Sequence, residues 1–157
     1  MRSSRCRVVG VMLIACAALG LTASVASAKA TTKFSVTVTD NFAVPPIRFE
    51  VTDPPSEADR YKVQLINDSI GPHVWIAVGG LPEDLTVDEF IDFLDSGAPP
   101  PAGAFEAGAV FAKPGQTHQK KFDFTVPGRY GFFCPIPTPA GIPHYQLGFA
   151  GVFDVAP

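Results

Sequence analysis

Apolar and polar residues alternate along most of the chain after about residue 30, which is the period of β-strands with one buried face. In the segment 33–40, for example, Phe34, Val36 and Val38 fall on one face. Similar short segments, separated by turns rich in proline and glycine, predict strands at 33–40, 47–51, 61–65, 73–78, 121–126, 129–134 and 151–155. Short strands at regular spacing are typical of an antiparallel sandwich or barrel, so we predict an all-β fold.

One segment has a helical period instead. In the stretch TVDEFIDFLDSG, apolar residues recur at i, i+3, i+4 and i+7 from Val87 onward, which is the spacing of one helical face. Thr86 and Glu89 have the spacing of a capping box, and Gly97 followed by prolines ends the pattern. The sequence therefore predicts one short helix at about 86–96, inserted among the strands.

The outer face of this helix is acidic. Between Lys62 and Lys113 the chain has no lysine or arginine, while carboxylates gather on and just before the helix, at Glu83, Asp84, Asp88, Glu89, Asp92 and Asp95. Such a face can be an ordinary solvated surface, or it can be a docking surface for a basic partner. The sequence leaves both interpretations open.

The N-terminus has the pattern of an export signal. Three arginines precede the apolar segment 8–21, and the small residues Ala26, Ser27 and Ala28 match a signal-peptidase site. We therefore predict that residues 1–28 are a signal peptide, that 29–157 form one domain, and that the protein is periplasmic or secreted. The mature chain is expected to have no transmembrane segment and to be a monomer.

An alternative for this N-terminus is lipid anchoring. The residues Leu13, Ile14, Ala15 and Cys16 resemble a bacterial lipobox, in which the cysteine becomes the lipidated first residue. In either case the three leader arginines are lost, which changes the formal net charge from −3 to −6. A chain this acidic has no general electrostatic reason to bind nucleic acid.

Cys134 is the only cysteine after residue 28, so it has no disulfide partner within the mature chain. The histidines of the same region are His73, His118 and His144, of which His118 has polar neighbours and is expected on the surface. A thiolate and two imidazoles suit a trigonal copper site, although zinc accepts the same ligands. A buried structural cysteine and a Cys/His nucleophilic pair are the alternatives.

Three stretches give a more specific indication: PHVW at 72–75, GRYGFFCPIP at 128–137 and PHYQLGFAGVFDV at 143–155. Together they resemble the cupredoxin, or blue copper, family. The helical segment LPEDLTVDEFIDFLDSGAPPP at 81–101 and the loop of nine residues between Cys134 and His144 resemble, in particular, a poorly characterised group of exported bacterial members. The resemblance implies a Greek-key β-sandwich holding one type 1 copper per chain. It also implies that His73, Cys134 and His144 are the metal ligands.

The sequence departs from the family pattern in two places. The position of the family's axial methionine, five residues after the loop histidine, is occupied by Phe149, which cannot coordinate a metal. This implies a three-coordinate site, or one with only a distant backbone oxygen near Pro72 in addition, and a raised reduction potential. The alternative is a site that has fallen out of use. Val74 replaces an asparagine that steadies the ligand loop in many members, and Asn67 or Ser69 are candidates to take over that role.

The resemblance implies electron transfer to a redox protein partner, possibly a basic one, and no enzymatic activity. Multicopper oxidases have histidines beside the cysteine, whereas here its neighbours are Phe133 and Pro135. We expect electrons to pass through His144, within an apolar rim of Ile136, Ile142 and Phe149. The alternative function is copper delivery, or a metal-free interaction domain with the same fold.

Overall fold

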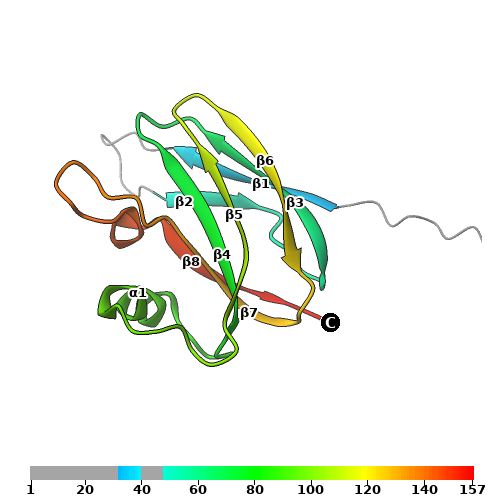
Figure 1. Cartoon of the computed structure of the whole chain (residues 1–157). Coiled ribbons are helices and arrows are strands. Elements are labelled where there is room, and N and C mark those ends of the chain that lie inside the picture. The colour runs from blue at the N-terminus through cyan, green and yellow to red at the C-terminus, as the bar shows by residue number, and fades with distance from the viewer. Residues whose placement is uncertain (1–31, 40–47) are drawn as a thin grey trace, which may run out of the picture.

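The computed structural model describes residues 32–39 and 48–157. They form two four-stranded sheets packed face to face, with α1 (Val87–Ser96) on the outside (Figure 1). The first sheet has the order β2-β1-β3-β6 and the second the order β5-β4-β7-β8. The strands are β1 (Thr32–Thr39), β2 (Arg48–Thr52), β3 (Asp59–Asn67), β4 (His73–Leu81), β5 (Phe105–Ala112), β6 (Thr117–Phe124), β7 (Gly128–Phe133) and β8 (Ala150–Val155). The predicted sandwich with an inserted helix is confirmed.

The alternating residues of the strands meet in one core between the sheets. Phe34, Val36 and Val38 of β1 are buried as predicted. Trp75 is fully buried at the centre, with its ring 5.6 Å from that of Phe34 and 5.5 Å from that of Phe132 on the neighbouring strand β7. Burial of each such aromatic side chain contributes about 1.5–3 kcal/mol, so this aromatic core stabilises the fold and fixes the two sheets relative to each other.

One strand pair departs from the antiparallel arrangement. β1 pairs with β2 in the antiparallel sense, but it pairs with β3 in the parallel sense. The reason is the connection, because the chain reverses from β1 to β2 on one side and then crosses to the other side of β1 before β3 begins. The remaining pairs, β3–β6, β4–β5, β4–β7 and β7–β8, are antiparallel.

The helix α1 forms where the sequence predicts it. The Thr86 side chain accepts a hydrogen bond from the Glu89 backbone N–H, the Glu89 carboxylate accepts from Thr86, and Gly97 ends the helix in the left-handed conformation. Phe90 is fully buried against the outer face of β7, where an added Cβ at Gly131 would lie 2.5 Å from its ring. Glycine is therefore required there, because any side chain would push the helix off the sheet.

The sequence missed two elements and misplaced the bounds of others. It missed β5 and the 3-10 helix η1 (His144–Leu147), placed the start of β6 four residues late, at 121 instead of 117, and ended β4 three residues early, at 78 instead of 81. The predicted signal peptide 1–28, the lipobox, and the strand ends at Asp40 and Ile47 lie outside the described residues. Within the described ranges, no helix is long and apolar enough to span a membrane.

Candidate metal centre

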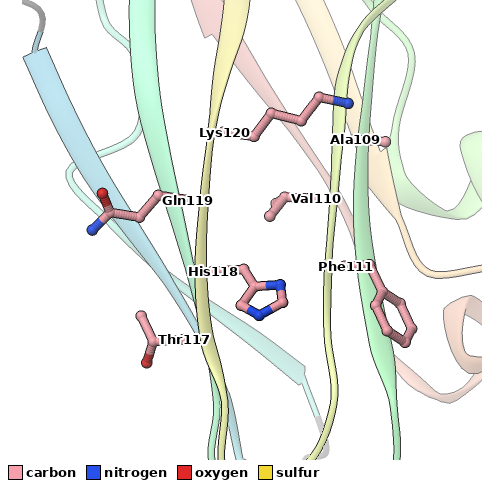
Figure 2. Close-up of a pocket in the computed structure, with 7 residues that line it drawn as sticks. All are labelled: Ala109, Val110, Phe111, Thr117, His118, Gln119 and Lys120. Carbon is pink, nitrogen blue, oxygen red and sulfur yellow. The ribbon is translucent and has the colours of Figure 1, made fainter.

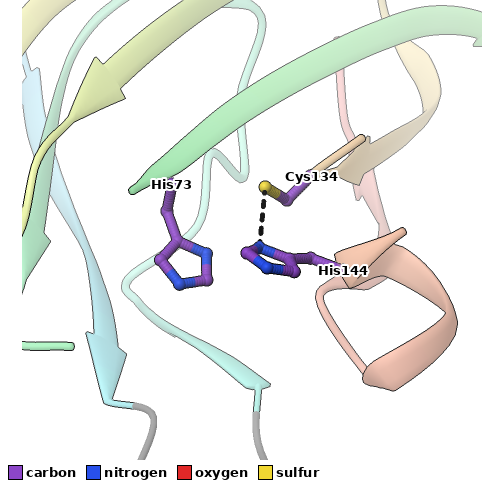
Figure 3. A group of neighbouring side chains, drawn as sticks. All are labelled: His73, Cys134 and His144. Atoms are coloured by element: carbon purple, nitrogen blue, oxygen red, sulfur yellow. Dashed lines mark hydrogen bonds between the residues drawn. The ribbon is translucent and has the colours of Figure 1, made fainter. Parts of the chain in front are cut away.

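The three candidate ligands come from the ends of neighbouring elements. His73 is the first residue of β4, Cys134 follows the last residue of β7, and His144 begins η1. β4 and β7 are antiparallel neighbours, with Ile76 opposite Phe133, so the start of one strand lies beside the end of the other. Strand pairing thus brings together two residues that are far apart in the sequence, and the loop after β7 returns His144 to them (Figure 3).

The three side chains form a compact, buried group. One ligand atom of each, the cysteine sulfur and a ring nitrogen of each histidine, lies within 4.8 Å of the other two. His73 and Cys134 have no exposed surface and His144 is 7% exposed. The Cys134 Sγ lies 3.6 Å from His144 Nδ1, and the centres of the two imidazole rings are 4.5 Å apart. The structure therefore gathers the three residues that the sequence proposed as ligands.

This geometry fits a metal ion. A metal bonded to a thiolate at about 2.3 Å and to an imidazole at about 2.0 Å, with an angle between tetrahedral and trigonal, keeps sulfur and nitrogen about 3.5–3.8 Å apart. The observed separation of 3.6 Å lies in this range. Soft sulfur with two imidazole nitrogens is a donor set for copper and for zinc.

The environment of the thiol does not suit a nucleophile. Burial raises the pKa of Cys134, and backbone N–H groups of Val74 and Ile136 that donate to the sulfur lower it by less. The Val74 nitrogen lies 3.5 Å from Sγ. A nucleophilic cysteine needs a lowered pKa and access for a substrate, and Cys134 has neither. The same two N–H groups can stabilise a thiolate whose charge is balanced by a bound metal.

The loop between Cys134 and His144 is closed by backbone hydrogen bonds. The His144 N–H donates to the carbonyl of Ile136 at 2.9 Å, and the Tyr145 N–H donates to the carbonyl of Cys134 at 3.0 Å. The Cys134 N–H in turn donates to the carbonyl of Phe149 at 3.0 Å. With the prolines of the loop, these bonds restrict the backbone that carries both ligands, so its length of nine residues does not make it loose.

On the His73 side, a buried polar pair supports the segment that leads into the ligand. The Asn67 side chain donates from Nδ2 to the carbonyls of Gly71 and Ala112, both at 2.9 Å. Ser69 donates its N–H to Asn67 Oδ1 and its hydroxyl to the Gly71 carbonyl. Ala112 is the strand partner of His73. Asn67 and Ser69 thus take the supporting role for which the sequence named them.

On the His144 side, the support comes from α1, which the sequence did not anticipate. Asp95 Oδ1 accepts hydrogen bonds from the Tyr145 hydroxyl at 2.9 Å and from Gln146 Nε2 at 2.6 Å. Both donors belong to η1, and burial together with Asp95 raises the pKa of Tyr145. One of the acidic residues of the helix face, which the sequence left as either a solvated surface or a docking surface, therefore holds the helical turn that begins with His144.

Aromatic rings close the site on the side of Phe149. This residue is 2% exposed, and its ring centre lies 4.6 Å from that of His73 and 5.5 Å from that of His144. Phe49 packs behind it at 5.2 Å. The expectation that Phe149 forms part of a surface rim is thus wrong, because the hydrogen bonds that close the loop draw it into the core. It shields the site from water and offers no donor atom.

The edge of His144 lies in a groove at the end of the sandwich. This groove has a volume of about 600 Å³, and its walls are mostly apolar, formed by Ile70, Gly71, Pro72, Pro137, Thr138 and Pro139. Ile70 is 76% exposed. The sequence does not indicate this exposure, because Ile70 lies outside any strand pattern. The apolar surface around His144 thus consists of Ile70 and prolines, with Ile142 exposed nearby in the same loop.

His118 lies elsewhere, as the sequence predicts. It is exposed on β6, in an open groove between β5 and β6 that also contains Phe111 and Lys120 (Figure 2). It takes no part in the group around Cys134.

No protein-family model and no curated protein matches the sequence. Among solved structures, the chain is similar to auracyanin A, a "blue" copper protein of Chloroflexus aurantiacus, with 19% identity, a TM-score of 0.53, and coverage of 80% of this chain and 98% of that one. It is also similar to reduced rusticyanin, with 18% identity, a TM-score of 0.50, and coverage of 80% and 79% respectively. A reduced auracyanin of Roseiflexus castenholzii aligns at 25% identity and a TM-score of 0.49, over 81% of this chain and 98% of that one. The two sheets, their packing and the first two of these similarities show that the chain has the cupredoxin fold.

Proposed function

We propose that the protein binds one copper ion as a type 1 site and carries single electrons between redox partners. The observation that carries this proposal is the buried group of His73, Cys134 and His144, with its sulfur-to-nitrogen distance of 3.6 Å. The solved structures with the same fold include a protein described as blue copper, which supports copper over zinc. When bound in such a donor set, copper supplies a one-electron couple.

The residues around the site suit this role. Cys134 and the two histidines would hold the metal, and the hydrogen-bonded loop and strand ends keep these ligands in place in both oxidation states. Phe149 packs against both imidazole rings and would lie beside a bound copper without donating to it, which would favour the reduced state and raise the reduction potential. His144 is the ligand that borders the apolar groove, so it is the proposed route for electrons and the groove is the proposed contact for a partner.

Addition of Cu(II) to the purified protein tests the proposal. We expect an intense visible thiolate-to-copper band and a small copper hyperfine splitting in the paramagnetic resonance spectrum. Cys134→Ala should abolish both, and His118→Ala, which changes a histidine outside the site, should leave both intact. Absence of the band from the unaltered protein would refute the type 1 site and favour the metal-free interaction domain.

The role of Phe149 has its own test. Phe149→Met places a thioether beside the two imidazoles, so we expect a lower reduction potential than that of the unaltered protein, measured by redox titration of the visible band. Phe49→Met is the matched control, because it makes the same exchange one ring farther from the ligands. Equal potentials for all three proteins would show that Phe149 does not occupy the axial side.

Export is part of the proposal as well. The mature N-terminus, determined by mass spectrometry of the protein from its native cells, should be Lys29 after cleavage of the signal peptide. A lipidated N-terminus at Cys16 would instead establish the anchored form. Neither result bears on the copper site, so the two parts of the proposal are tested independently.

We propose electron transfer in preference to catalysis because the described residues offer only His118 as a further histidine, and it lies outside the site. The two neighbours of Cys134, Phe133 and Pro135, provide no ligand for a second metal. Turnover of oxygen or nitrite by the purified copper-loaded protein would contradict this part of the proposal.

A further inference from the structure

Three lysines form a row across the outer face of the sheet β2-β1-β3-β6. Lys33 of β1 lies directly opposite Lys62 of β3, and Lys62 lies directly opposite Lys121 of β6. Each lies next to a buried core residue of its strand, namely Phe34, Tyr61 and Phe122, and successive side chains alternate between the faces, so the three lysines leave the sheet on its outer face. Neighbouring strands lie about 4.8 Å apart, so this lysine row is about 10 Å long.

The lysine row is unfavourable for an isolated molecule. Like charges directly opposite each other on neighbouring strands destabilise a sheet. In the part of the chain that the structure describes, none of the three lysines forms an ion pair. The nearby Arg60 and Asp123 form an ion pair with each other, with 2.8 Å between Nε and Oδ1. The next row of the sheet holds the neutral residues Ser35, Gln64 and Gln119, which shows that uncharged side chains fit such positions. An anionic partner would relieve the repulsion.

The opposite face of the molecule carries two neighbouring negative charges. α1 covers the outer face of the other sheet, and its Asp88 and Asp92 are exposed one helical turn apart, a spacing at which like charges repel. No ion pair joins either of them to another described residue. Glu89 and Asp95 differ, because they accept hydrogen bonds from within the protein. Asp88 and Asp92, which we call the acidic pair, are thus the carboxylates of α1 left for a cationic partner.

We propose that the lysine row of one copy of this protein binds the acidic pair of a second copy. Each surface contains a repulsion that the other relieves, and the acidic pair, about 6 Å long, fits within the length of the lysine row. The two surfaces lie on opposite faces of the sandwich, as the positions of α1 and of β1, β3 and β6 show (Figure 1). The contact is therefore head to tail, and it generates chains of copies instead of two-fold dimers.

This assembly differs from the monomer expected from the sequence. The basic partner of the acidic helix is then a second copy of the same protein. The groove beside His144 lies at the end of the sandwich and is lined by the segments 70–72 and 137–139, outside both contact faces. Each copy in such a chain can thus still meet a redox partner at its candidate metal site. The proposal does not depend on the metal, because both surfaces are formed by the polypeptide alone.

Sedimentation equilibrium on the purified protein tests the contact. At an ionic strength of about 0.01 M, where charges act over about 30 Å, the average mass should rise with protein concentration, and at about 1 M salt it should return to that of the monomer. Lys33→Gln/Lys62→Gln/Lys121→Gln should be monomeric at low salt, as should Asp88→Asn/Asp92→Asn. An equimolar mixture of these two variants retains one intact contact and should form a heterodimer of twice the monomer mass.

The matched control removes three positive charges elsewhere. Arg48→Gln/Lys113→Gln/Lys120→Gln changes the net charge by the same amount as the lysine-row variant and should still associate. A protein that stays monomeric at every concentration at low salt, or a mixture of the two variants that fails to pair, overturns the proposal. So does equal loss of association in the control. Binding of the lysine row to vesicles containing anionic lipid, with no self-association, would assign the row to a membrane surface instead.

Discussion

The two histidines of the candidate site are held by different kinds of structure. His73 begins a central strand, is fully buried, and lies opposite Ala112, whose carbonyl is bonded to Asn67. His144 lies in a loop after the sheet and is held by backbone bonds within the loop and by Asp95 of α1 acting on the next two residues. One ligand is therefore placed by the sandwich itself, and the other by a helix added to the sandwich.

The largest effect is expected when the imidazole of each histidine is removed in turn. His73→Gly and His144→Gly should each abolish the thiolate-to-copper band. Free imidazole should restore it only in His144→Gly, because the groove of about 600 Å³ leads to His144, whereas His73 has no exposed surface. The measurement is a titration of each copper-loaded variant with imidazole, followed by visible absorption.

Circular dichroism of both glycine variants provides the control for folding, since His73→Gly also removes a side chain from the core. Restoration of the band in both variants at similar imidazole concentrations would show that free imidazole reaches both ligand positions equally well. That result would contradict the difference between the two histidines.

A smaller effect is expected from the support of His73. Asn67→Ala leaves the buried carbonyls of Gly71 and Ala112 without their donor, which should lower the free energy of unfolding by about 1–3 kcal/mol. Urea denaturation of the metal-free protein measures this change. Gln64→Ala is the control on the same strand and should change the stability by no more than about 0.5 kcal/mol. Equal effects of the two substitutions would mean that Asn67 is not a support.

The support of His144 should matter less for stability than for the site. Asp95→Ala removes the acceptor of Tyr145 and Gln146 near the surface, with a cost of about 1 kcal/mol or less. We expect copper to dissociate faster, measured by transfer to a chelator, because η1 is freer to move. Asp95→Asn keeps an acceptor oxygen and should dissociate copper more slowly than Asp95→Ala. Asp92→Ala, one turn earlier, is the control and should behave like the unaltered protein.

Sequence periodicity predicts those parts of this fold whose two faces differ in polarity. β1 and β3 alternate between buried positions and half-buried or exposed ones over most of their length, and α1 shows both its apolar stripe and its capping box. β5 lacks this signal, because Gly108 interrupts its alternation opposite an irregular pairing at Ala77 and Val78. The first half of β6, Thr117 to Lys121, is exposed on both faces and therefore has no apolar period. These strands are set by pairing with their neighbours, which a single sequence does not show.

The candidate site divides in the same way. The residue types of the ligands and the loop that carries two of them are local features of the sequence. They could therefore be identified as candidate ligands from the resemblance to known proteins. The contacts of Asp95 span 50 and 51 residues, so no local pattern connects α1 to His144. Phe149 was expected in the apolar rim around His144, whereas the hydrogen bond from the Cys134 N–H to its backbone carbonyl accompanies a ring that is buried in the core. Long-range hydrogen bonds thus decide what periodicity leaves open.

The smallest expected effect concerns the segment that leads into α1, far from the ligands. Arg129 donates to both carboxylate oxygens of Asp154 at 2.9 Å and to the carbonyl of Leu85 at 2.6 Å, and so ties this segment to β7 and β8. The hydrogen bonds from Arg129 lower the pKa of Asp154 in the folded protein. The stabilisation is therefore present above the unfolded pKa, about 3.9, and is lost as the pH falls through the lower folded pKa.

Asp154→Asn should accordingly lower the Tm slightly at pH 7, and the difference from the unaltered protein should shrink as the pH falls toward 3, as measured by circular dichroism. Asp123→Asn, which breaks the more exposed pair with Arg60, should have a still smaller effect. A difference for Asp154→Asn that persists at pH 3 would mean that neutral hydrogen bonds, and not charge, hold Arg129 to Asp154. In that case the segment that leads into α1 would be held independently of pH.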